Sequence, residues 1–593
     1  GSGTIAPLSG MYNSGSQVWV AAQANPGYVF TGFSGALSGT TNPQIVIMDA
    51  NKSVTAGFAP SPPLTVSCSV TPAPAEVGQE VTFSAAVSGG STPYTFSWSG
   101  AVSGSSQSIK FVPSQAGGYQ ATVTVNQAGA ASCSTAVAHP ALATFRNCIG
   151  PNGSGTTCQL PQGTYEVPPF THREDQPRYY LEIGRPGITI TGTRVTGPSD
   201  TVLRRGVWRA SAGAMPPARR IMSSSAALAG VTIKDLTFDG NRYGAGLNCL
   251  PGNAEYYDLN LEAGGSFTVQ WVDFMNAPGW ALSLGGNSTV SLSNFGQGGY
   301  GIGPSLQPGY QTAAETATRS TAIWINGADN GAWYNNISYA GTAGITINGA
   351  RQFAYGNFLQ RNRYEISDGS GGGQIFVSPG SVDATVAGNV IDGGEWPPAQ
   401  WPPQLASGCA APIERQFNAG VEAYGFGHRF YNNEIVNNTG SGMQFAGSEA
   451  TGRITISSAN PWDASDTPRF VERNGAGGIA FLGPEWCATH NFPGQCQSTS
   501  GVTLDAVLVR DNGGPSVFLD GVSNNGSHTG FVNGSCISGN HIDGVPADIP
   551  TGQNSLTYPA PSSYASYRGG ACPVSAWPQL PAPASSHIPG WPW

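Results

Sequence analysis

The sequence predicts an all-β chain whose second half winds into stacked coils. Short apolar strands recur there, separated by Gly and Asn rather than by helices. The interval from Ile323 to Ile345 equals that from Val421 to Met443, and a fixed interval between strands is typical of a solenoid. Gly is abundant, at 83 of 593 residues, and charged residues make up only 10%. This composition favours turns and strands over exposed helices. The recurring strands are residues 323–325, 345–347, 375–377, 421–423, 443–445, 479–481 and 517–519.

Length and charge limit the classes of function. A chain of 593 residues is too long for one core, so we expect two to four domains. Its formal net charge is −9, and Lys occurs only at Lys52, Lys110 and Lys234. Nucleic acid is therefore excluded as a partner, because neutralising phosphates needs a basic surface. An acidic polysaccharide is also a poor match to this charge.

The chain begins with a small β-domain over residues 1–60. Alternating segments at 10–20, 26–35 and 48–58 are joined by Gly turns. The sequence of these segments resembles the divergent internalin-B-type repeats of bacterial surface and secreted proteins. In that family a further strand normally precedes the segment with which this chain begins, so the resemblance implies upstream material that was cleaved, omitted or unresolved. A missing strand would leave an open sheet edge able to accept a strand from a neighbouring chain.

A second small domain is expected over residues 61–140, after a proline-rich linker at 60–63. Segments 81–87, 94–98 and 119–125 alternate with a period of two. They resemble an immunoglobulin-like sandwich of the polycystic-kidney-disease type, which implies Trp98 in the core. We interpret both N-terminal domains as spacers or surface modules, because a fold alone does not confer function.

From residue 141 to 593 the pattern changes. Segments 158–167, 187–192 and 231–241 resemble the opening coils of the pectate-lyase-like right-handed parallel β-helix, and the resemblance continues to about residue 540. It implies a right-handed parallel β-helix (solenoid) with two small N-terminal β-domains. It implies no single activity, because this superfamily includes lyases, glycosidases, epimerases, phage tailspikes and adhesins.

The cysteines indicate an oxidising compartment. Their number is even, at ten, and none has zinc-ligand spacing with histidines. Disulfides therefore predict an extracellular or cell-surface protein of bacterial, secreted type. No apolar run has the length of a membrane span and no signal peptide is present, so we expect a mature form. The expected pairs are Cys68 with Cys133, Cys148 with Cys158, Cys487 with Cys496, Cys249 with Cys409 and Cys536 with Cys572.

Asparagines follow the recurring strands at a similar offset. Stacked Asn side chains can hydrogen-bond from coil to coil and satisfy polar groups at the corners of a β-helix. We expect this structural role for Asn336, Asn357, Asn389 and Asn433.

The middle residue of each recurring strand is expected to point outward, since the flanking apolar residues point inward. We call these middle residues the outward row. The row contains two large aromatics and a carboxylate, which is unusual for a surface facing only water and would suit a glycan. The alternative is that inserted loops cover the rings and form a secondary core. The outward row is Ser283, Trp324, Thr346, Phe376, Glu422, Gln444, Ala480 and Phe518.

Long inserted segments are expected beside this row. The longest intervals precede Ile323, Ile375 and Val421, and loops there would form one wall of a groove. The last of them carries Glu395, Trp396 and Trp401 in a proline-stiffened stretch, which a bond between Cys249 and Cys409 would hold to an earlier coil.

Glycoside hydrolysis needs two carboxylic groups. Our preferred pair is Glu422 with Asp392 or Glu395; Asp383, Asp329 and Asp368 are reserves. A solvated turn carboxylate is the alternative for each of them. The expected substrate-binding residues are Trp324, Phe376, Trp396, Trp401, Tyr424, Gln444 and Arg429.

Other family motifs are incomplete. The polygalacturonase set is missing, with Gly427-His428-Arg429 its nearest fragment. The run from Tyr424 to His428 resembles the Tyr-Gly-Phe-Asp-Pro-His signature of mannuronan epimerases, but lacks the Asp and Pro. A polysaccharide lyase would need clustered Asp with a basic residue; Arg351 and Arg429 are available, but no compact Asp cluster is evident. We expect no cofactor and no metal, and structural calcium is not indicated.

These observations leave two main hypotheses. One is a secreted glycoside hydrolase acting on a neutral or weakly charged polysaccharide, with a polysaccharide lyase as a further alternative. The other is an extracellular structural or adhesive protein without catalysis. It would self-associate through the open N-terminal edge or through the tail at 588–593. That tail can instead cap the open end of the solenoid.

Overall fold

The computed structural model divides into two units, residues 1–137 with 208–215, and residues 138–207 with 216–593. The residues it describes are 2–90, 92–126, 129–169, 180–194, 199–210, 219–241, 256–277, 279–296, 321–338, 340, 343–360, 362, 373–393, 419–438, 440–446, 451–458, 469–475, 477–482, 499–505, 507–510, 512, 517–519, 522–523, 530–532, 536–538, 541–542 and 545–546.

The first unit begins with two small antiparallel sheets of the N-terminal repeat, in the order β1-β2-β4 and β3-β5. Their core contains Val18, Val20, Phe33, Leu37 and Val46. The strands are β1 (Gly3–Ala6), β2 (Gln17–Ala24), β3 (Tyr28–Gly35), β4 (Gln44–Ile47) and β5 (Val54–Pro60).

The rest of the first unit is a β-sandwich. Trp98 is buried against Phe83, with ring centroids 6.3 Å apart, and its indole N–H donates to the carbonyl of Ser106. A disulfide joins Cys68 to Cys133, as expected. The strands are β6 (Thr65–Thr71), β7 (Ala75–Glu76), β8 (Val81–Ser88), β9 (Phe96–Gly100), β10 (Ser108–Phe111), β11 (Gly117–Val125) and β12 (Gly129–Ala138), with β17 (Trp208–Ala210) pairing in parallel with β11.

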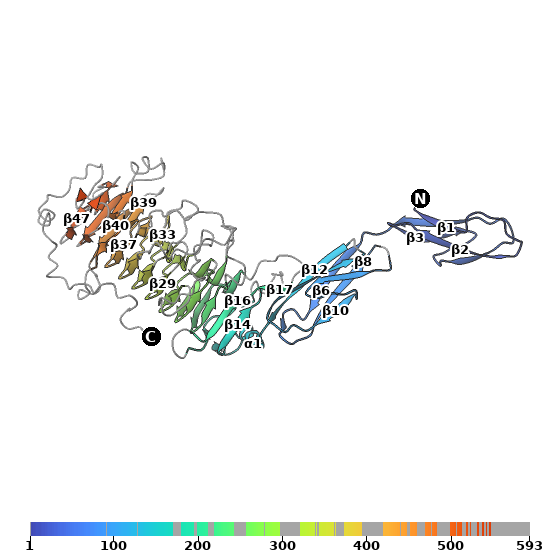
Figure 1. Ribbon diagram of the computed structural model, residues 1–593, viewed down its shortest axis with the longest axis horizontal. Coiled ribbons are helices and arrows are strands. Elements are labelled where there is room, and N and C mark those ends of the chain that lie inside the picture. Colours follow the sequence, from blue (N-terminus) through green and yellow to red (C-terminus); the bar gives the residue numbers. More distant parts are fainter. Residues whose placement is uncertain are drawn as a thin grey trace. The chain divides into compact units, whose positions relative to one another are not determined.

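The second unit is a right-handed parallel β-helix, as the sequence predicts. Three long parallel sheets run along it, with 10, 12 and 13 strands in the described residues, and Figure 1 shows them as successive coils. The 10-stranded sheet contains β18 (Arg220–Ser223), β21 (Tyr257–Leu261), β24 (Trp280–Gly285), β27 (Ile323–Ala328), β30 (Ile345–Ala350), β33 (Gly373–Val377), β36 (Ala419–Ala423), β39 (Ser441–Ala446), β42 (Gly477–Leu482) and β45 (Val517–Leu519).

The other two sheets complete each coil. The 13-stranded sheet contains β13 (Thr157–Gln159), β15 (Thr189–Thr191), β19 (Leu228–Lys234), β22 (Gly265–Gln270), β25 (Thr289–Ser291), β28 (Gly331–Trp333), β31 (Phe353–Tyr355), β34 (Thr385–Ala387), β37 (Arg429–Tyr431), β40 (Thr451–Ser457), β43 (Thr499–Asp505), β46 (Val522–Ser523) and β47 (Gly530–Val532). The 12-stranded sheet contains β14 (Gly163–Val167), β16 (Thr201–Arg205), β20 (Thr237–Asp239), β23 (Asp273–Met275), β26 (Asn294–Phe295), β29 (Asn336–Ser338), β32 (Phe358–Gln360), β35 (Val390–Asp392), β38 (Glu434–Val436), β41 (Val471–Glu472), β44 (Leu508–Arg510) and β48 (Cys536–Ser538). A short antiparallel pair, β49 (His541–Ile542) and β50 (Val545–Pro546), follows.

The chain visits the three sheets in a constant order. A strand of the 10-stranded sheet is followed by one of the 13-stranded and then one of the 12-stranded sheet, as in β30, β31 and β32. In these coils, short connections join the 10-stranded sheet to the 13-stranded sheet and the 13-stranded sheet to the 12-stranded sheet. The long segments lie at the third corner, between β32 and β33 and between β35 and β36. This confirms that the inserts precede the strands that carry the outward row.

Asparagines form a continuous ladder at the corner between the 13-stranded and 12-stranded sheets. Asn335, Asn357, Asn389 and Asn433 are linked by amide–amide hydrogen bonds of 3.0, 2.9 and 2.9 Å. Each acceptor oxygen also receives the backbone N–H of the Asn in the preceding coil. The predicted ladder was wrong at one position, because Asn335 rather than Asn336 belongs to it. Asn336 is instead the first residue of β29.

A second ladder stands at the corner that carries the long segments. It runs from Asn362 through Gln374, Asn438 and Asn474 to Asn512, with side-chain hydrogen bonds of 2.9–3.2 Å. All five side chains are buried. This ladder ties the segment between β32 and β33 to the stack at both ends, because Asn362 precedes that segment and Gln374 follows it.

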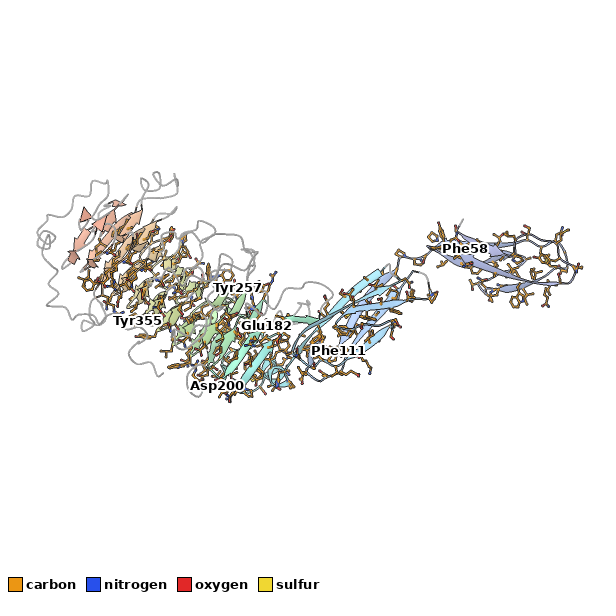
Figure 2. The ribbon with its side chains drawn as sticks, in the orientation of Figure 1. Phe58, Phe111, Glu182, Asp200, Tyr257 and Tyr355 are labelled. Atoms are coloured by element: carbon orange, nitrogen blue, oxygen red, sulfur yellow. A yellow bond between two sulfur atoms is a disulfide. The ribbon has the colours of Figure 1, made fainter. Side chains whose placement is uncertain are left out.

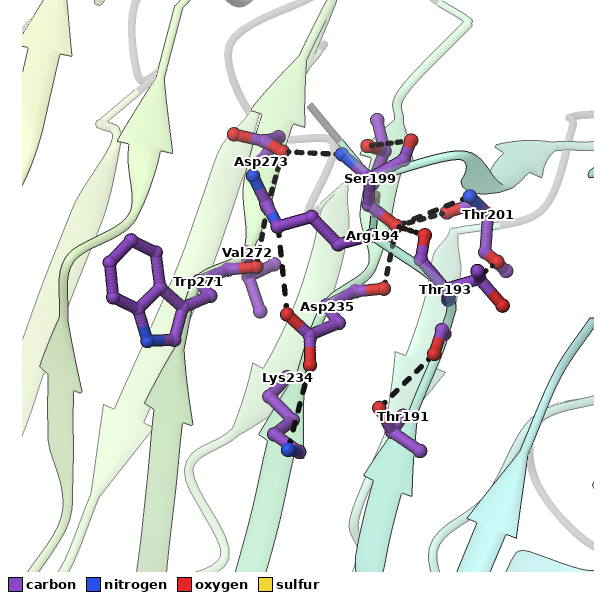
Figure 3. Close-up of polar contacts among 12 residues, drawn as sticks. Thr191, Thr193, Arg194, Ser199, Thr201, Lys234, Asp235, Trp271, Val272 and Asp273 are labelled. Atoms are coloured by element: carbon purple, nitrogen blue, oxygen red, sulfur yellow. Dashed lines mark hydrogen bonds and ion pairs between the residues drawn. The ribbon is translucent and has the colours of Figure 1, made fainter. Parts of the chain in front are cut away.

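The first coils use an ion-pair network where later coils use asparagine. The Arg194 guanidinium donates to the Asp273 carboxylate and to the Trp271 carbonyl at 2.7 Å, and Nε lies 3.5 Å from Asp235. The backbone N–H of Ser199 donates to the same Asp273 carboxylate (Figure 3). These contacts satisfy turn groups at the corner where Asn335 stands further along.

One described helix, α1 (Pro140–Ile149), begins the β-helix unit. Leu142, Phe145 and Ile149 are buried, and the disulfide between Cys148 and Cys158 ties the helix to β13. It therefore supplies the polar-faced cap that the first coil of a solenoid needs, a feature that the sequence interpretation did not include. The other expected disulfides, which involve Cys249, Cys409, Cys487, Cys496, Cys536 and Cys572, rest on side chains outside the described residues.

The ladder predicts that an asparagine within it contributes much more to the free energy of unfolding than an asparagine outside it. Replacing Asn389 with Ala removes the acceptor for the Asn357 amide and backbone N–H, and each buried donor left without a partner costs about 1–3 kcal/mol. We expect the urea midpoint of the β-helix to fall clearly, by the equivalent of about 3 kcal/mol. The matched change Asn336→Ala should cost less than about 1 kcal/mol. Equal losses in both variants would show that the ladder is not the stabilising element.

Candidate functional site

The outward row exists as one continuous line on the 10-stranded sheet. The register pairs Ser283 with Trp324, Trp324 with Thr346, and Thr346 with Phe376. It then continues in the same way, Phe376 to Glu422, Glu422 to Gln444, Gln444 to Ala480 and Ala480 to Phe518. The flanking residues are fully buried, as Ile323, Ile325, Val421 and Ala423 illustrate. The register therefore confirms that these residues form one continuous row.

The row is far less exposed than an open ridge. Glu422 is only 1% exposed, and Ser283 and Thr346 are also buried. Trp324, Phe376 and Gln444 are half-buried. The expectation of large exposed aromatics was wrong in this respect, and the burial agrees with the alternative of a covered face. A buried carboxylate on this row needs polar partners, because burying an uncompensated charge is costly.

Tyr424 supplies one such partner. Its hydroxyl donates a hydrogen bond to Glu422 Oε1, and its ring packs edge-on against Phe376 with centroids 5.8 Å apart. Glu422 and Tyr424 lie two residues apart at the end of β36, and two residues is the spacing that places side chains on one face of a strand. The structure thus brings together three of the predicted residues, Phe376, Glu422 and Tyr424.

Asp392 lies on a different sheet. It is the last residue of β35 in the 12-stranded sheet, and it accepts a hydrogen bond of 2.9 Å from the Asn437 amide. Its register partner is Val436, which in turn pairs with Glu472. The neighbours of Asp392 in the register are thus Gln360 and Val436, and the sheet that carries Asp392 is not the sheet of Glu422.

Glu434 is an acidic residue that the sequence interpretation missed. Burial raises the pKa of its carboxyl group; Arg469 opposes this, and the charges of Glu472 and Asp392 add to it. Glu434 therefore lies with Asp392 and Glu472 along the outer face of the 12-stranded sheet. The sequence signal was weak, since Glu434 precedes Ile435 in the same way that many solvated turn residues precede a strand.

The remaining predicted residues fall elsewhere. Arg429 begins β37 on the 13-stranded sheet and is exposed, so it does not share the face of Glu422. Asp329 forms a two-hydrogen-bond ion pair with Arg351, with both distances 2.7 Å. Asp383 lies in a turn with a φ of 55°. Three site residues, Glu395, Trp396 and Trp401, and the reserve Asp368 lie outside the described residues.

His428 has a structural role. Its Nδ1 accepts the backbone N–H of Ala384 at 3.1 Å, and its Nε2–H donates to the carbonyl of Tyr424 at 2.7 Å. In the register, His428 occupies the position that Gln352 holds two coils earlier, next to the paired residues Phe353, Thr385 and Arg429. With both ring nitrogens engaged and no exposure, His428 holds a corner of the stack.

Neither a metal centre nor a membrane span is visible in the described part of the chain. No group of three or more His, Cys, Asp or Glu side chains there is placed to hold a metal ion. Helix α1 has ten residues, and within the described ranges no helix combines the length and apolarity of a membrane span.

The two N-terminal modules match known domain families. Residues 1–62 match the model of the divergent InlB B-repeat domain, and residues 64–139 match that of the PKD domain. Both matches confirm the resemblances seen in the sequence. No curated protein matches the chain.

Solved structures similar to this chain include a mannuronan epimerase, an α-1,3-glucanase and a mannuronic-acid-specific polysaccharide lyase. The A-module of a mannuronan C-5 epimerase from Azotobacter vinelandii is 16% identical, with a TM-score of 0.33, over 68% of this chain and 89% of that one. The catalytic unit of an α-1,3-glucanase from Streptomyces thermodiastaticus is 11% identical, with a TM-score of 0.37, over 91% and 95%. A mannuronic-acid-specific lyase from human gut microbiota is 11% identical, with a TM-score of 0.26, over 68% and 81%. None is similar enough for residue roles to be transferred.

The burial of His428 predicts a pH dependence of stability. Burial lowers the pKa of His428 to about 4, with the Tyr424 hydrogen bond and the Asp383 charge acting in the opposite direction. An unfolded histidine titrates near 6.5, so between pH 6.5 and 4 the unfolded chain binds a proton that the folded chain does not. The contribution of His428 is therefore complete above about pH 6.5 and is lost as the pH falls toward 4, by about 1.4 kcal/mol per pH unit.

The test compares wild type with the His428→Gln variant. Glutamine fits this corner, because Gln352 holds the same position two coils earlier. Urea midpoints measured at pH 7 and pH 5 should fall less in the variant, by the equivalent of about 2 kcal/mol. Acidic groups elsewhere titrate equally in both proteins and cancel in the difference. Identical pH dependence in the two proteins would mean that His428 is not held neutral by burial.

Proposed function

We propose that this protein is an extracellular glycoside hydrolase that acts on a neutral or weakly charged polysaccharide at the 10-stranded sheet. The observation that carries the proposal is the outward row, in which Trp324, Phe376, Glu422 and Gln444 follow one another in register. Aromatic rings can stack on the C–H faces of sugar rings, Gln444 offers both a donor and an acceptor to hydroxyl groups, and Glu422 supplies the carboxylate. The net charge of −9 favours an uncharged substrate over an acidic one.

Glu422 suits the role of the fixed carboxylate of a catalytic pair. Tyr424 donates a hydrogen bond to Glu422 Oε1. The same hydrogen bond fixes the orientation of the carboxylate on a rigid strand, as nucleophilic or base catalysis requires. In this proposal Glu422 acts as nucleophile or base, and an acid from the neighbouring long segment protonates the leaving group.

The second carboxyl group is Glu395 or Asp392. Asp392 is the last residue of β35, and Glu422 lies in β36, the next strand along the chain. The segment between these strands therefore follows Asp392 and precedes Glu422. Glu395 belongs to that segment. An extracellular location is supported by the two disulfides of the described residues, because such bonds persist in oxidising compartments.

Glu422→Gln should abolish hydrolysis while leaving the fold intact. The change keeps the size and most hydrogen bonds but removes the charge, and loss of a catalytic carboxylate costs roughly 100-fold or more in kcat. Activity is measured as reducing ends released from a panel of neutral polysaccharides, with absorbance of unsaturated products recorded to detect a lyase. Urea midpoints verify that stability is retained.

The matched control is Glu262→Gln. Glu262 accepts a 2.6 Å hydrogen bond from Ser283, the first residue of the outward row, so it is also a carboxylate held by a hydroxyl beside this sheet. It lies beside β21, five strands before β36 in the sheet order, and the variant should keep activity within about twofold. If Glu422→Gln remained active, the site assignment would be refuted.

Asp392→Asn and Glu395→Gln, tested separately, then identify the second carboxyl group, because only the variant that lacks it should be inactive.

The structural or adhesive function is favoured by a different observation. The N-terminal repeat exposes Trp19 by 61%, Ile45 by 37% and Ile47 by 53%, and the register places Trp19 beside Ile45 on neighbouring strands. A cavity of about 390 Å³ also opens between β1 and β5, lined by Gly3, Ile5, Val54 and Phe58 among others. Contiguous exposed apolar residues and an open sheet edge are typical of association surfaces.

Sedimentation velocity distinguishes this second function. Association through the repeat should give oligomers at high protein concentration that dissociate when Trp19 is changed to Ser, because that change removes the largest exposed apolar side chain of the patch. A wild-type protein that stays monomeric at every concentration would argue against a fibre or adhesive array built through this domain.

A further inference from the structure

A second group of aromatic side chains lies on the outer face of the 13-stranded sheet. Trp333 ends β28 and Phe353 and Tyr355 belong to β31, the next strand of the sheet, while Tyr334 follows Trp333 in the turn. We call these four residues the aromatic platform. Tyr334 is 41% exposed and Phe353 36% exposed, and the other two are half-buried. Ala332 and Ala354, between them on the two strands, are fully buried, so the platform faces outward.

The rings form one connected surface. Trp333 and Phe353 are nearly parallel, at 17°, with centroids 5.8 Å apart. Tyr355 lies 5.8 Å from Trp333, and Tyr334 stands at 90° to Tyr355 with centroids 5.5 Å apart. The platform therefore extends across both strands and onto the turn that follows (Figure 2 labels Tyr355).

Glycines hold these rings close to the backbone. A Cβ at Gly331 would lie 2.1 Å from Trp333 Nε1, and one at Gly356 would lie 2.6 Å from the Tyr334 ring. Gly356 has a φ of 66° and Gly388, next to the Tyr355 ring, a φ of 63°. Two rings thus rest against positions that only glycine can leave open, which fixes their orientation before any ligand arrives.

The surroundings of the platform are small and polar. Along the outer face, Thr289 and Ser291 precede it and Thr385 and Ala387 follow it in register. Arg351 and Asp329, in the turns before the two strands, form an ion pair. Arg429 stands one register position beyond Thr385, and Arg469 donates to the carbonyl of Gly388. No Leu, Ile or Met stands at these outward positions, so rings alone make up the exposed apolar surface here.

From these observations we propose that the aromatic platform is a binding site for neutral glycan chains, separate from the outward row. Fixed aromatic rings offer surfaces on which the C–H faces of sugar rings can stack. Thr289 and Ser291, on the preceding strand, place hydroxyl groups beside the rings. The site lies on the 13-stranded sheet and Glu422 on the 10-stranded sheet, so it binds without cleaving and does not depend on the proposed hydrolysis.

The test uses the full chain carrying Glu422→Gln, so that no polymer is degraded. Native gels containing laminarin, dextran, galactomannan or arabinoxylan are compared with gels without polymer, and alginate serves as the charged comparison. At least one neutral polymer should retard the protein, and Trp333→Ala should raise the apparent dissociation constant roughly tenfold or more. Trp333→Phe should recover most of the affinity, because a ring remains.

Trp19→Ala is the matched control, since it removes an exposed tryptophan from another domain. Retardation that is unchanged in Trp333→Ala, or lost equally in Trp19→Ala, would overturn the proposal. So would a Trp333-dependent dimer in sedimentation without polymer binding, which would make a second copy the occupant. Hydrolysis by the unmodified protein is measured separately. If that protein degrades none of the polymers, the proposed function is refuted and the platform proposal is not. If no polymer retards the protein, the platform proposal is refuted and the proposed function is not.

Discussion

Every coil of the β-helix must satisfy polar groups at its corners, and the side-chain ladders do this. A corner buried between neighbouring coils has no water to pair with, so each amide must find its partner one coil above or below. Asn357, Asn389 and Asn433 meet this requirement by using one oxygen for two donors. Such bonds hold successive coils in a single register. The straight outward row, with Glu422 beside Phe376, and the aromatic platform both follow from that register.

Polar residues other than asparagine also satisfy corner groups, which changes the interpretation of residues that look catalytic. His428 belongs to a run that resembles an epimerase signature, yet both of its ring nitrogens are engaged in the corner. Gln374 likewise takes the place of an asparagine between Asn362 and Asn438. A polar side chain at a corner is therefore explained by stacking before catalysis is considered. Glu422 differs, because it lies within a strand and not at a corner.

The strands, the order of the row and two disulfides could be predicted because each depends on a local pattern or a short spacing. The ladder position could not be chosen between Asn335 and Asn336, since both are asparagines and only the register separates them. Burial of Glu422 was not predictable either, because exposure depends on what folds over a strand and not on the strand. The aromatic platform was missed although Trp333 and Tyr355 are visible in the sequence. Its strands have Ala rather than Ile at their buried centres, so they lack the strongly apolar pattern that identifies the other strands.

The corner between the 12-stranded and 10-stranded sheets has an evolutionary consequence. Its ladder fixes the chain on both sides of a long segment, at Asn362 and Gln374, so the coils on either side keep their alignment whatever length lies between. A change of length between these two residues would leave β32 and β33 aligned, because each residue is bonded to a different coil. Evolution can therefore lengthen or shorten the chain at this corner while the strands on both sides keep their place in the stack.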